Sequence, residues 1–459
     1  MILTINGGSS SIKFALYQAG ATELTLVMKG KIDRVGTKEA TLSFRRAENA
    51  PAASAEPSVS AAAPTVSGEL PVAADDLQQA GTSLADWLEQ QPDLDRVTAI
   101  GHRIVHGMEV LQTTRIDEAL LRHLRNIQPY DPDHLPGEIQ LIETFRGRYP
   151  RATQVACFDT AFHADMPRVA SQLPIPRRFD AEGIRRYGFH GLSYEYILKR
   201  LGQLVPPYVT NGRMIFAHLG SGASAAAIKG GKSIDTSMGF TPAGGLMMGT
   251  RPGDLDLGAA WYMMRKDGLS PDAFNNLINH QCGLLGVSGT SSDMRDLMER
   301  AGMSGQGPAA TGDPQGGSNV HGGGDAQDGA NAQVGGDVQG GANAPGATSA
   351  SDAAHTPHGD YRAAEAISLF CYTVKKWIGS FSAALGGLET LVFTGGIGEN
   401  IPQIRWRICE GLDHLGIYLD HGLNDKNAVL VSSHDSRVSV YVIPTDEEYM
   451  IAEKTSQHI

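Results

Sequence analysis

The chain has 459 residues, of which 41% are hydrophobic and 19% charged, and its formal net charge is -12 at pH 7. This acidic balance argues against nucleic acid and anionic membrane surfaces as partners. No run approaches the roughly 18 apolar residues of a membrane helix, and Met1 leads into a strand-like segment instead of a signal sequence. We therefore expect a cytoplasmic protein. The four cysteines lie far apart, so neither a disulfide framework nor a zinc site is indicated.

Strands and helices alternate along the chain. Residues 1–17 (MILTINGGSSSIKFALY) predict a strand, a Gly/Ser turn and a second strand, and residues 213–229 (RMIFAHLGSGASAAAIK) have the same layout. Both turns place a serine four residues after a glycine, which hints at a duplicated fold. The pairs are Gly7 with Ser11 and Gly220 with Ser224.

Two stretches have compositions that cannot build a core. Residues 47–80 are rich in Ala, Pro and Ser, and residues 302–360 contain no Lys, Arg, Leu, Ile or Phe. Because such segments bury too little apolar surface to offset the entropy of ordering, we expect both to be mobile or disordered surface inserts. Without the second insert about 400 residues remain, enough for two domains.

A long helix and a third glycine-rich stretch follow the second insert. Apolar side chains recur at helical spacing over residues 361–385, which predicts a helix packed on a core. Residues 389–400 (ETLVFTGGIGEN) predict a strand that ends in a glycine-rich loop, where a ligand can approach the backbone closely. Three glycine-rich turns in one chain indicate a polyphosphate held from both sides of a cleft. Neither the GxGxxG nor the GxxxxGK[ST] signature is present.

Charged side chains occur in several further motifs. They are Arg103 in GHRIVHG, Asp159 in CFDTAFH, His190 in RRYGFHG, Arg251 in GTRPGDLD and Glu447 in VIPTDEEY. Phosphoryl transfer needs guanidinium groups for the equatorial oxygens, one or two carboxylates for Mg²⁺ and a backbone cradle for the phosphates. A general base is not needed if the acceptor is itself a carboxylate.

The motifs together resemble those of acetate kinases and their short-chain acyl relatives, in the same order and over nearly the whole chain apart from the two inserts. They read LTINGGSSSIKF, GHRIVHG, FDTAFH, RRYGFHGLS, AHLGSGAS, DTSMGFTPAGGLMMGTRPGDLD, GLLGVSGTSSDMRD, VFTGGIGEN and IPTDEEYMIA. The resemblance implies an α/β, two-domain duplicated fold of the sugar-kinase, Hsp70 and actin type, ribonuclease H-like, with a nucleotide cleft between the domains. Residues 1–160 would form the N-terminal domain and 161–447 the nucleotide-binding domain, with 448–459 returning to the first.

The resemblance also implies the activity. The protein would transfer the γ-phosphoryl group of ATP directly and in line to acetate, reversibly, giving acetyl phosphate and ADP. It would be a Mg²⁺-dependent (or Mn²⁺-dependent) phosphotransferase with a carboxyl group as acceptor, and a homodimer.

Four residues would be catalytic by this resemblance. Arg103 and Arg251 would bind the carboxylate and neutralise the transition state. His190 would donate a hydrogen bond to the phosphoryl group in transfer, and Asp159 would position the substrate.

The remaining site residues are also implied by the matching motifs. Asn6 and Glu447 would lie at the metal ion and the transferring phosphoryl group. The acyl pocket would consist of Val105, Phe189 and Pro242, with Arg103 binding the carboxylate. The ATP site would comprise Lys13, His218, Leu219, Gly220, Ser221, Gly222, Gly395, Gly396, Ile397, Gly398, Glu399 and Asn400.

The chain departs from the family pattern at four positions. Tyr130 stands where the family often has His, Ser221 replaces a usual Asn, and Leu192 and Tyr194 replace the common Thr and His. These departures leave the reaction class intact and the finer ligand contacts open.

Two alternatives stay open. A propionate or butyrate kinase would share the chemistry, because one methylene group contributes only about 1–3 kcal/mol to discrimination. A nucleotide-switch module of the actin or Hsp70 type is more remote, because it would not need Arg103 and Arg251 facing the γ-phosphate.

Overall fold

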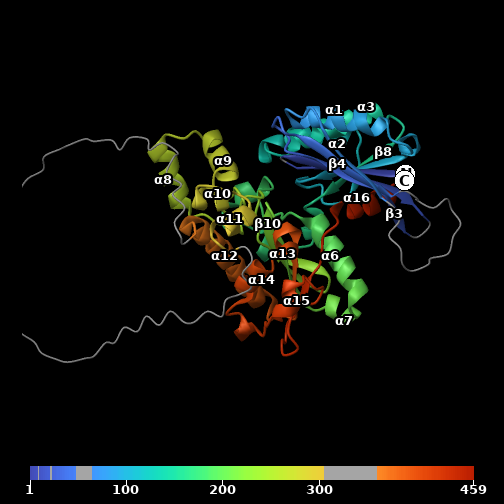
Figure 1. Ribbon diagram of the computed structural model, residues 1–459. Helices are drawn as coiled ribbons and strands as arrows, with labels where there is room; N and C mark the ends of the chain where they lie inside the picture. Colours follow the sequence, from blue (N-terminus) through green and yellow to red (C-terminus); the bar gives the residue numbers. More distant parts are fainter. Residues whose placement is uncertain (9, 21–22, 48–64, 304–358) are drawn as a thin grey trace, which may run out of the picture.

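Two β-sheets organise the computed structural model, which describes residues 1–8, 10–20, 23–47, 65–303 and 359–459 (Figure 1). The first sheet has the order β5-β4-β3-β2-β1-β6-β8-β7 and the second β11-β10-β9-β12-β13. The first comprises β1 (Ile2–Gly7), β2 (Ser11–Ala19), β3 (Leu24–Asp33), β4 (Thr41–Ala47), β5 (Thr65–Pro71), β6 (Ala99–Ile104), β7 (Thr114–Arg115) and β8 (Thr153–Phe158). The second comprises β9 (Arg213–Leu219), β10 (Ala223–Lys229), β11 (Lys232–Thr236), β12 (Thr390–Thr394) and β13 (Ser439–Val442).

The same five-strand arrangement occurs in both sheets. β1 pairs antiparallel with β2 and parallel with β6, and β9 pairs antiparallel with β10 and parallel with β12. The order β3-β2-β1-β6-β8 thus matches β11-β10-β9-β12-β13. Both predicted strand–turn–strand units are present, and the duplicated α/β fold is confirmed.

Helices cover both faces of each sheet. Alternate residues of β1 and β2 face either α1 (Leu77–Glu89) and α3 (Leu135–Arg148) or, on the other side, α16 (Glu447–Ser456) (Figure 1). In the second sheet, α12 (Tyr361–Leu385) packs on one face and α6 (Gly191–Leu204) on the other. The helix predicted over residues 361–385 is confirmed, and its periodic apolar side chains are buried.

The other helices connect these layers. They are α2 (Glu118–Ile127), α4 (Arg168–Ser171), α5 (Arg177–Ala181), α7 (Pro207–Thr210), α8 (Leu257–Asp267), α9 (Pro271–His280), α10 (Gly283–Ser288), α11 (Met294–Arg300), α13 (Gly395–Asn400), α14 (Pro402–Cys409), α15 (His421–Asp425) and four 3-10 turns, Leu94–Arg96, Gln128–Tyr130, Ala161–His163 and Asp413–Leu415. Across the part of the chain that the structure describes, no helix is long and apolar enough to cross a bilayer.

Two sequence predictions need correction. The predicted insert 47–80 is too long, because residues 65–71 form β5, which pairs along β4 with Leu70 opposite Leu42, and α1 begins at Leu77. The strand supplies the partner that the backbone of β4 requires. The glycine-rich loop predicted after β12 is instead the short helix α13. The rest of the first insert, residues 48–64, and residues 304–358 of the second lie outside the described residues.

The described residues on either side of 304–358 contact each other. The Asp360 backbone N–H donates to the Arg300 carbonyl at 2.7 Å. A Cβ placed on Gly359 would lie 2.6 Å from the Ala301 carbonyl oxygen. The end of α11 and the start of α12 thus meet through residues 300–301 and 359–360.

Replacing residues 304–358 with a short Gly/Ser linker should therefore leave the fold intact. We expect Tm to change by less than about 3 °C in a thermal unfolding scan, because a shorter loop costs little entropy to close. Removing residues 65–71 instead should lower Tm by more than about 5 °C, because the edge of β4 loses its partner. A large loss of folded protein on replacing 304–358 would contradict this expectation.

Candidate active site

The ends of three strands meet at an arginine and an aspartate. Arg103 is on β6, and Asp159 directly follows β8, the parallel neighbour of β6. The Arg103 Nη2 and Nε atoms donate to Asp159 Oδ2 at 2.6 and 3.1 Å, and Nη1 donates to the Gly7 carbonyl at 3.0 Å. Burial raises the pKa of Asp159, and the adjacent guanidinium opposes that rise. The second carboxylate oxygen, Oδ1, is buried without a partner among the described residues, so it can accept a hydrogen bond from a ligand.

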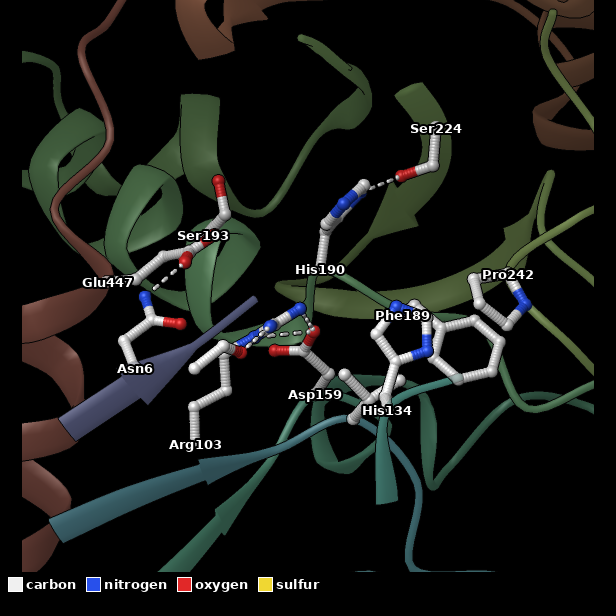
Figure 2. A network of polar contacts seen from close by, with 12 residues as sticks. Asn6, Arg103, His134, Asp159, Phe189, His190, Ser193, Ser224, Pro242 and Glu447 are labelled. Carbon is white, nitrogen blue, oxygen red and sulfur yellow. Dashed lines mark hydrogen bonds and ion pairs between the residues drawn. The ribbon is translucent and has the colours of Figure 1, made fainter. Parts of the chain in front are cut away.

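A second polar cluster joins β1 and β2 to the first turn of α16. Asn6 lies opposite Lys13 in the strand pair. The Asn6 Nδ2 atom donates to Glu447 Oε2 at 2.9 Å (Figure 2). It also donates to Glu448 Oε1 at 2.9 Å. Although burial opposes it, the positive charges of Lys13 and Arg103 lower the pKa of Glu447 to about 2. Glu447 is therefore an anion at pH 7, beside an amide whose carbonyl oxygen can also bind a cation.

Two neutral histidines form the third part of the site. His190 immediately precedes α6 in the left-handed conformation, with φ 60°. Its ring stacks on that of His218, with 4.2 Å between the centroids, and its Nδ1 atom is 2.9 Å from Ser224 Oγ. Burial, reinforced by His218 and Arg103, lowers the pKa of His190 well below its usual value. Burial lowers the pKa of His218 to about 4, so both rings are uncharged at pH 7.

Arg251 approaches His190 across the glycine loop between β9 and β10. A Cβ placed on Gly222 would lie 2.9 Å from Arg251 Nη2 and 3.4 Å from His190 Nε2. The absence of a side chain at Gly222 thus lets both groups reach the loop. Burial lowers the pKa of Arg251 to about 10, so the guanidinium is still charged at pH 7.

The second and third glycine-rich stretches are neighbours. Gly395 has φ +76°, and a Cβ there would lie 2.6 Å from the Leu219 carbonyl oxygen. Glu399 Oε1 accepts hydrogen bonds from the backbone N–H groups of Gly395 at 2.8 Å and Thr445 at 3.1 Å. The Asn400 amide donates to the Gly396 carbonyl at 2.9 Å. Both polar side chains therefore hold the backbone of α13.

Phe189 and Pro242, two of the residues predicted for the acyl pocket, lie on the other side of His190 and Asp159 from Asn6 and Glu447 (Figure 2). Val105 and Phe189 are buried in one apolar cluster. The Pro242 carbonyl accepts a hydrogen bond from Arg251 Nη1 at 2.8 Å. The structure thus places Pro242, one of the residues predicted for the acyl pocket, next to a cation.

Some supporting residues carry no signal in the motifs. Glu138 on α3 is buried and accepts hydrogen bonds from the Val105 N–H at 3.1 and 3.2 Å. Its position on the apolar face of α3 is the one sequence signal for it. Fully buried Arg405 donates to the carbonyls of Gly398 at 2.8 Å and Glu399 at 3.1 Å, and nothing in its neighbourhood along the chain indicates this role.

Comparison with known proteins places the chain in a family. The model of the acetokinase family matches residues 1–311 and 348–453. The chain belongs to the acetokinase family. Its relatives include the acetate kinases of Nitrobacter hamburgensis, 38% identical over 99% of this chain and 95% of the relative, and Bacillus subtilis, 33% identical over 98% and 97%. The sequence resemblance is thereby confirmed.

Solved structures from the family have the same fold. Acetate kinase from Porphyromonas gingivalis superposes with a TM-score of 0.73 at 30% identity, covering 99% of this chain and 98% of the other. A propionate kinase from Francisella tularensis superposes with a TM-score of 0.76 at 31% identity, covering 99% of both chains. The sequence match and the structural superposition therefore both cover the parts of the chain that carry the motifs.

The low pKa of Glu447 predicts a pH-dependent contribution to stability. Because the unfolded pKa is about 4.3 and the folded pKa is lower, the stabilisation is present above pH 4.3 and is lost as the pH falls towards 2. We expect Glu447→Gln to lower the free energy of unfolding by roughly 2–3 kcal/mol at pH 7, and by less at pH 3, in urea denaturation. Glu365→Gln, at an exposed position on α12, is the control. An equal loss at both pH values for Glu447→Gln would count against this electrostatic origin.

Proposed function

We propose that this chain is an acetate kinase, which transfers the γ-phosphoryl group of ATP to acetate and gives acetyl phosphate and ADP reversibly. The observation that supports this proposal most directly is that His190, a neutral histidine, lies close to two arginines. Burial and His218 lower the pKa of His190 most. The charges of Arg103 and Arg251 lower it further, so both guanidinium groups act on this ring. Two cations and a neutral donor suit a phosphoryl group passing between anionic oxygens.

The proposed mechanism needs alignment more than proton transfer. Acetate is deprotonated at pH 7, so its oxygen can attack without a general base. Arg251 and Arg103 would hold the carboxylate and offset the charge that spreads over the transferring group. His190 would donate a hydrogen bond to that group, and Asp159 would keep Arg103 in position through the two hydrogen bonds described above.

The cluster of Asn6, Glu447 and Glu448 fits a magnesium ion that also binds phosphate oxygens. Glu447 is anionic and lies beside the Asn6 side chain, so both can offer the oxygen ligands that Mg²⁺ prefers. Within the described residues no group of three His, Cys, Asp or Glu side chains forms a metal site. The pair of Glu447 and Asn6 suits Mg²⁺, which usually keeps several waters and takes one or two carboxylates plus phosphates. A bound ion would neutralise phosphate charge.

The ATP-binding part of the proposal rests on the two adjacent glycine stretches. Residues 219–222 lie next to α13, since a Cβ on Gly220 would be 3.9 Å from the Gly396 backbone nitrogen, and Lys13 lies on β2 near Glu447. We assign the polyphosphate to the loop of residues 219–222 and the adenosine to α13. In the same proposal, two domains close on ATP. One comprises residues 1–160 and 448–459, and the other comprises residues 161–447.

Three further features belong to the proposal through the family resemblance. They are a homodimer, a cytoplasmic location and dependence on a divalent metal ion. Sedimentation at several protein concentrations tests the first. Removal of the metal with EDTA and its restoration with Mg²⁺ or Mn²⁺ test the third.

A propionate kinase is the second candidate function. The structural similarity to the enzyme from Francisella tularensis favours it, at nearly the same identity as the acetate kinase from Porphyromonas gingivalis. Hydroxylamine trapping of acyl phosphate, with ATP and a series of acetate, propionate and butyrate, tests reaction and substrate together. ATP binding without any acyl phosphate would favour a nucleotide-switch module instead.

Substitution of Arg251 tests the electrostatic role. We expect Arg251→Ala to lower kcat/KM by roughly 10²-fold or more, because one preorganised charge is lost. The fold should survive, because this guanidinium has no ion-pair partner among the described side chains. Arg265→Ala, on the exposed part of α8, is the matched control. Wild-type turnover in folded Arg251→Ala would remove Arg251 from the mechanism.

Substitution of Val105 tests the acyl pocket. Val105→Ala enlarges an apolar site, so the ratio of kcat/KM for propionate over acetate should rise by roughly 3–10-fold. Val429→Ala, at a half-exposed position, should leave the ratio unchanged. An unchanged ratio in folded Val105→Ala would show that this side chain does not contact the acyl group.

A further inference from the structure

A chain of hydrogen bonds runs from α6 through β10 to the ring of His190. The Tyr194 hydroxyl contacts Ser224 Oγ, and Ser224 Oγ lies 2.9 Å from His190 Nδ1. Tyr194 and Ser224 are both fully buried. The opposite ring atom, His190 Nε2, is on the side of Gly222 and Arg251.

The chemistry of the three groups decides which atoms carry hydrogens. Burial raises the pKa of Tyr194, so the phenol keeps its proton at every physiological pH. The one acceptor in contact with that hydroxyl among the described residues is Ser224 Oγ. If Tyr194 donates to Ser224, the serine hydrogen is free to go to His190 Nδ1, and all three groups are satisfied.

Both other arrangements leave a buried hydrogen unpaired. If Nδ1–H donated to Ser224 and Ser224 donated to Tyr194, the phenol hydrogen would have no acceptor. If Tyr194 and His190 both donated to Ser224, the serine hydrogen would have no acceptor. An unmade hydrogen bond of a buried donor is expensive, so the order from Tyr194 to Ser224 to His190 is favoured.

We propose that Tyr194 and Ser224 are positioning residues that fix His190 in the tautomer with the proton on Nε2. This nitrogen then presents an N–H group, not a lone pair, to an anion held by Arg251. The other tautomer would direct a lone pair at the same anion and repel it.

The tautomer can be tested without reference to turnover. Protein labelled with ¹⁵N-histidine gives distinct nitrogen shifts for protonated and unprotonated ring atoms, and the spectrum of His190→Gln identifies the signals of His190. At pH 7 we expect Nε2 protonated and Nδ1 unprotonated in the wild type. Tyr194→Phe should shift the ring towards the other tautomer, whereas Tyr196→Phe, two residues along α6, should not. A wild-type ring protonated at Nδ1, or an unchanged spectrum in Tyr194→Phe, would overturn the proposal.

The consequence for catalysis rests on the proposed function and has its own measurement. In the acetate kinase assay, Tyr194→Phe should lower kcat by roughly 3–10-fold with KM for acetate unchanged, because only the transition state needs the donor. Ser224→Ala should have a similar effect, and the double variant should be no worse than Ser224→Ala alone, because both changes break one chain. Additive losses would mean two independent structural defects and would contradict the proposal. A wild type without acyl kinase activity would refute the function but leave the spectroscopic result decisive for the tautomer.

Discussion

Arg103 and Asp159 form an ion pair at the ends of two parallel strands, and the same guanidinium also binds the Gly7 carbonyl at the end of β1. A buried ion pair adds little net stability, because the cost of removing both charges from water offsets their attraction. The removal of one partner is costly, however, because it leaves the other charge buried and unpaired. Each residue therefore requires the other, and their contacts join the ends of β1, β6 and β8. Asn6, Arg103 and Asp159 take their positions from those strand ends.

Close packing around this pair depends on glycines that the motifs carry beside their charged residues. A Cβ on Gly191 would lie 2.1 Å from the Asp159 carbonyl oxygen, so α6 can begin against β8 only because this position has no side chain. A Cβ on Gly101 would lie 2.1 Å from Thr455 Oγ1, where α16 crosses β6. In GHRIVHG and RRYGFHG, packing and chemistry are thus served by different residues of one motif. The α16 contact in turn brings Glu447 to Asn6.

The sequence was informative where local pattern and tertiary structure agree. Alternating apolar strands around Gly/Ser turns predicted both hairpins, and helical periodicity predicted α12. The motifs indicated Arg103 and Asp159 as site residues, but their meeting at one sheet edge depends on the parallel pairing of β6 and β8, which the sequence did not predict. Strand β5 was missed because its residues follow an Ala/Pro-rich stretch, and its pairing with β4 is a tertiary effect. Helix α13 was missed because glycine favours loops.

Side-chain contacts that follow no periodic pattern explain what the sequence could not predict. The helical turn of α13 is held by Arg405, whose guanidinium is fully buried and binds the carbonyls of Gly398 and Glu399. The contact between Tyr194 and Ser224 joins residues 30 positions apart, one on a helix and one on a strand. Neither contact has a period or a spacing along the chain, so neither could be recognised before the fold was known.

The two arginines of the site differ in how their charge is balanced. Arg103 has Asp159 as an ion-pair partner, whereas the Arg251 side chain, among the described residues, donates a hydrogen bond to the Pro242 carbonyl. Burial lowers the pKa of Arg251 to about 10, which means that the folded protein holds this charge at a cost. His190 and His218 add no charge, because burial and the nearby cations keep both rings neutral. An anion bound at Arg251 would therefore offset the desolvation cost of this buried charge, whereas Asp159 already pairs with the charge of Arg103. In the proposed mechanism, Arg103 would set the geometry and Arg251 would gain most from a bound ligand.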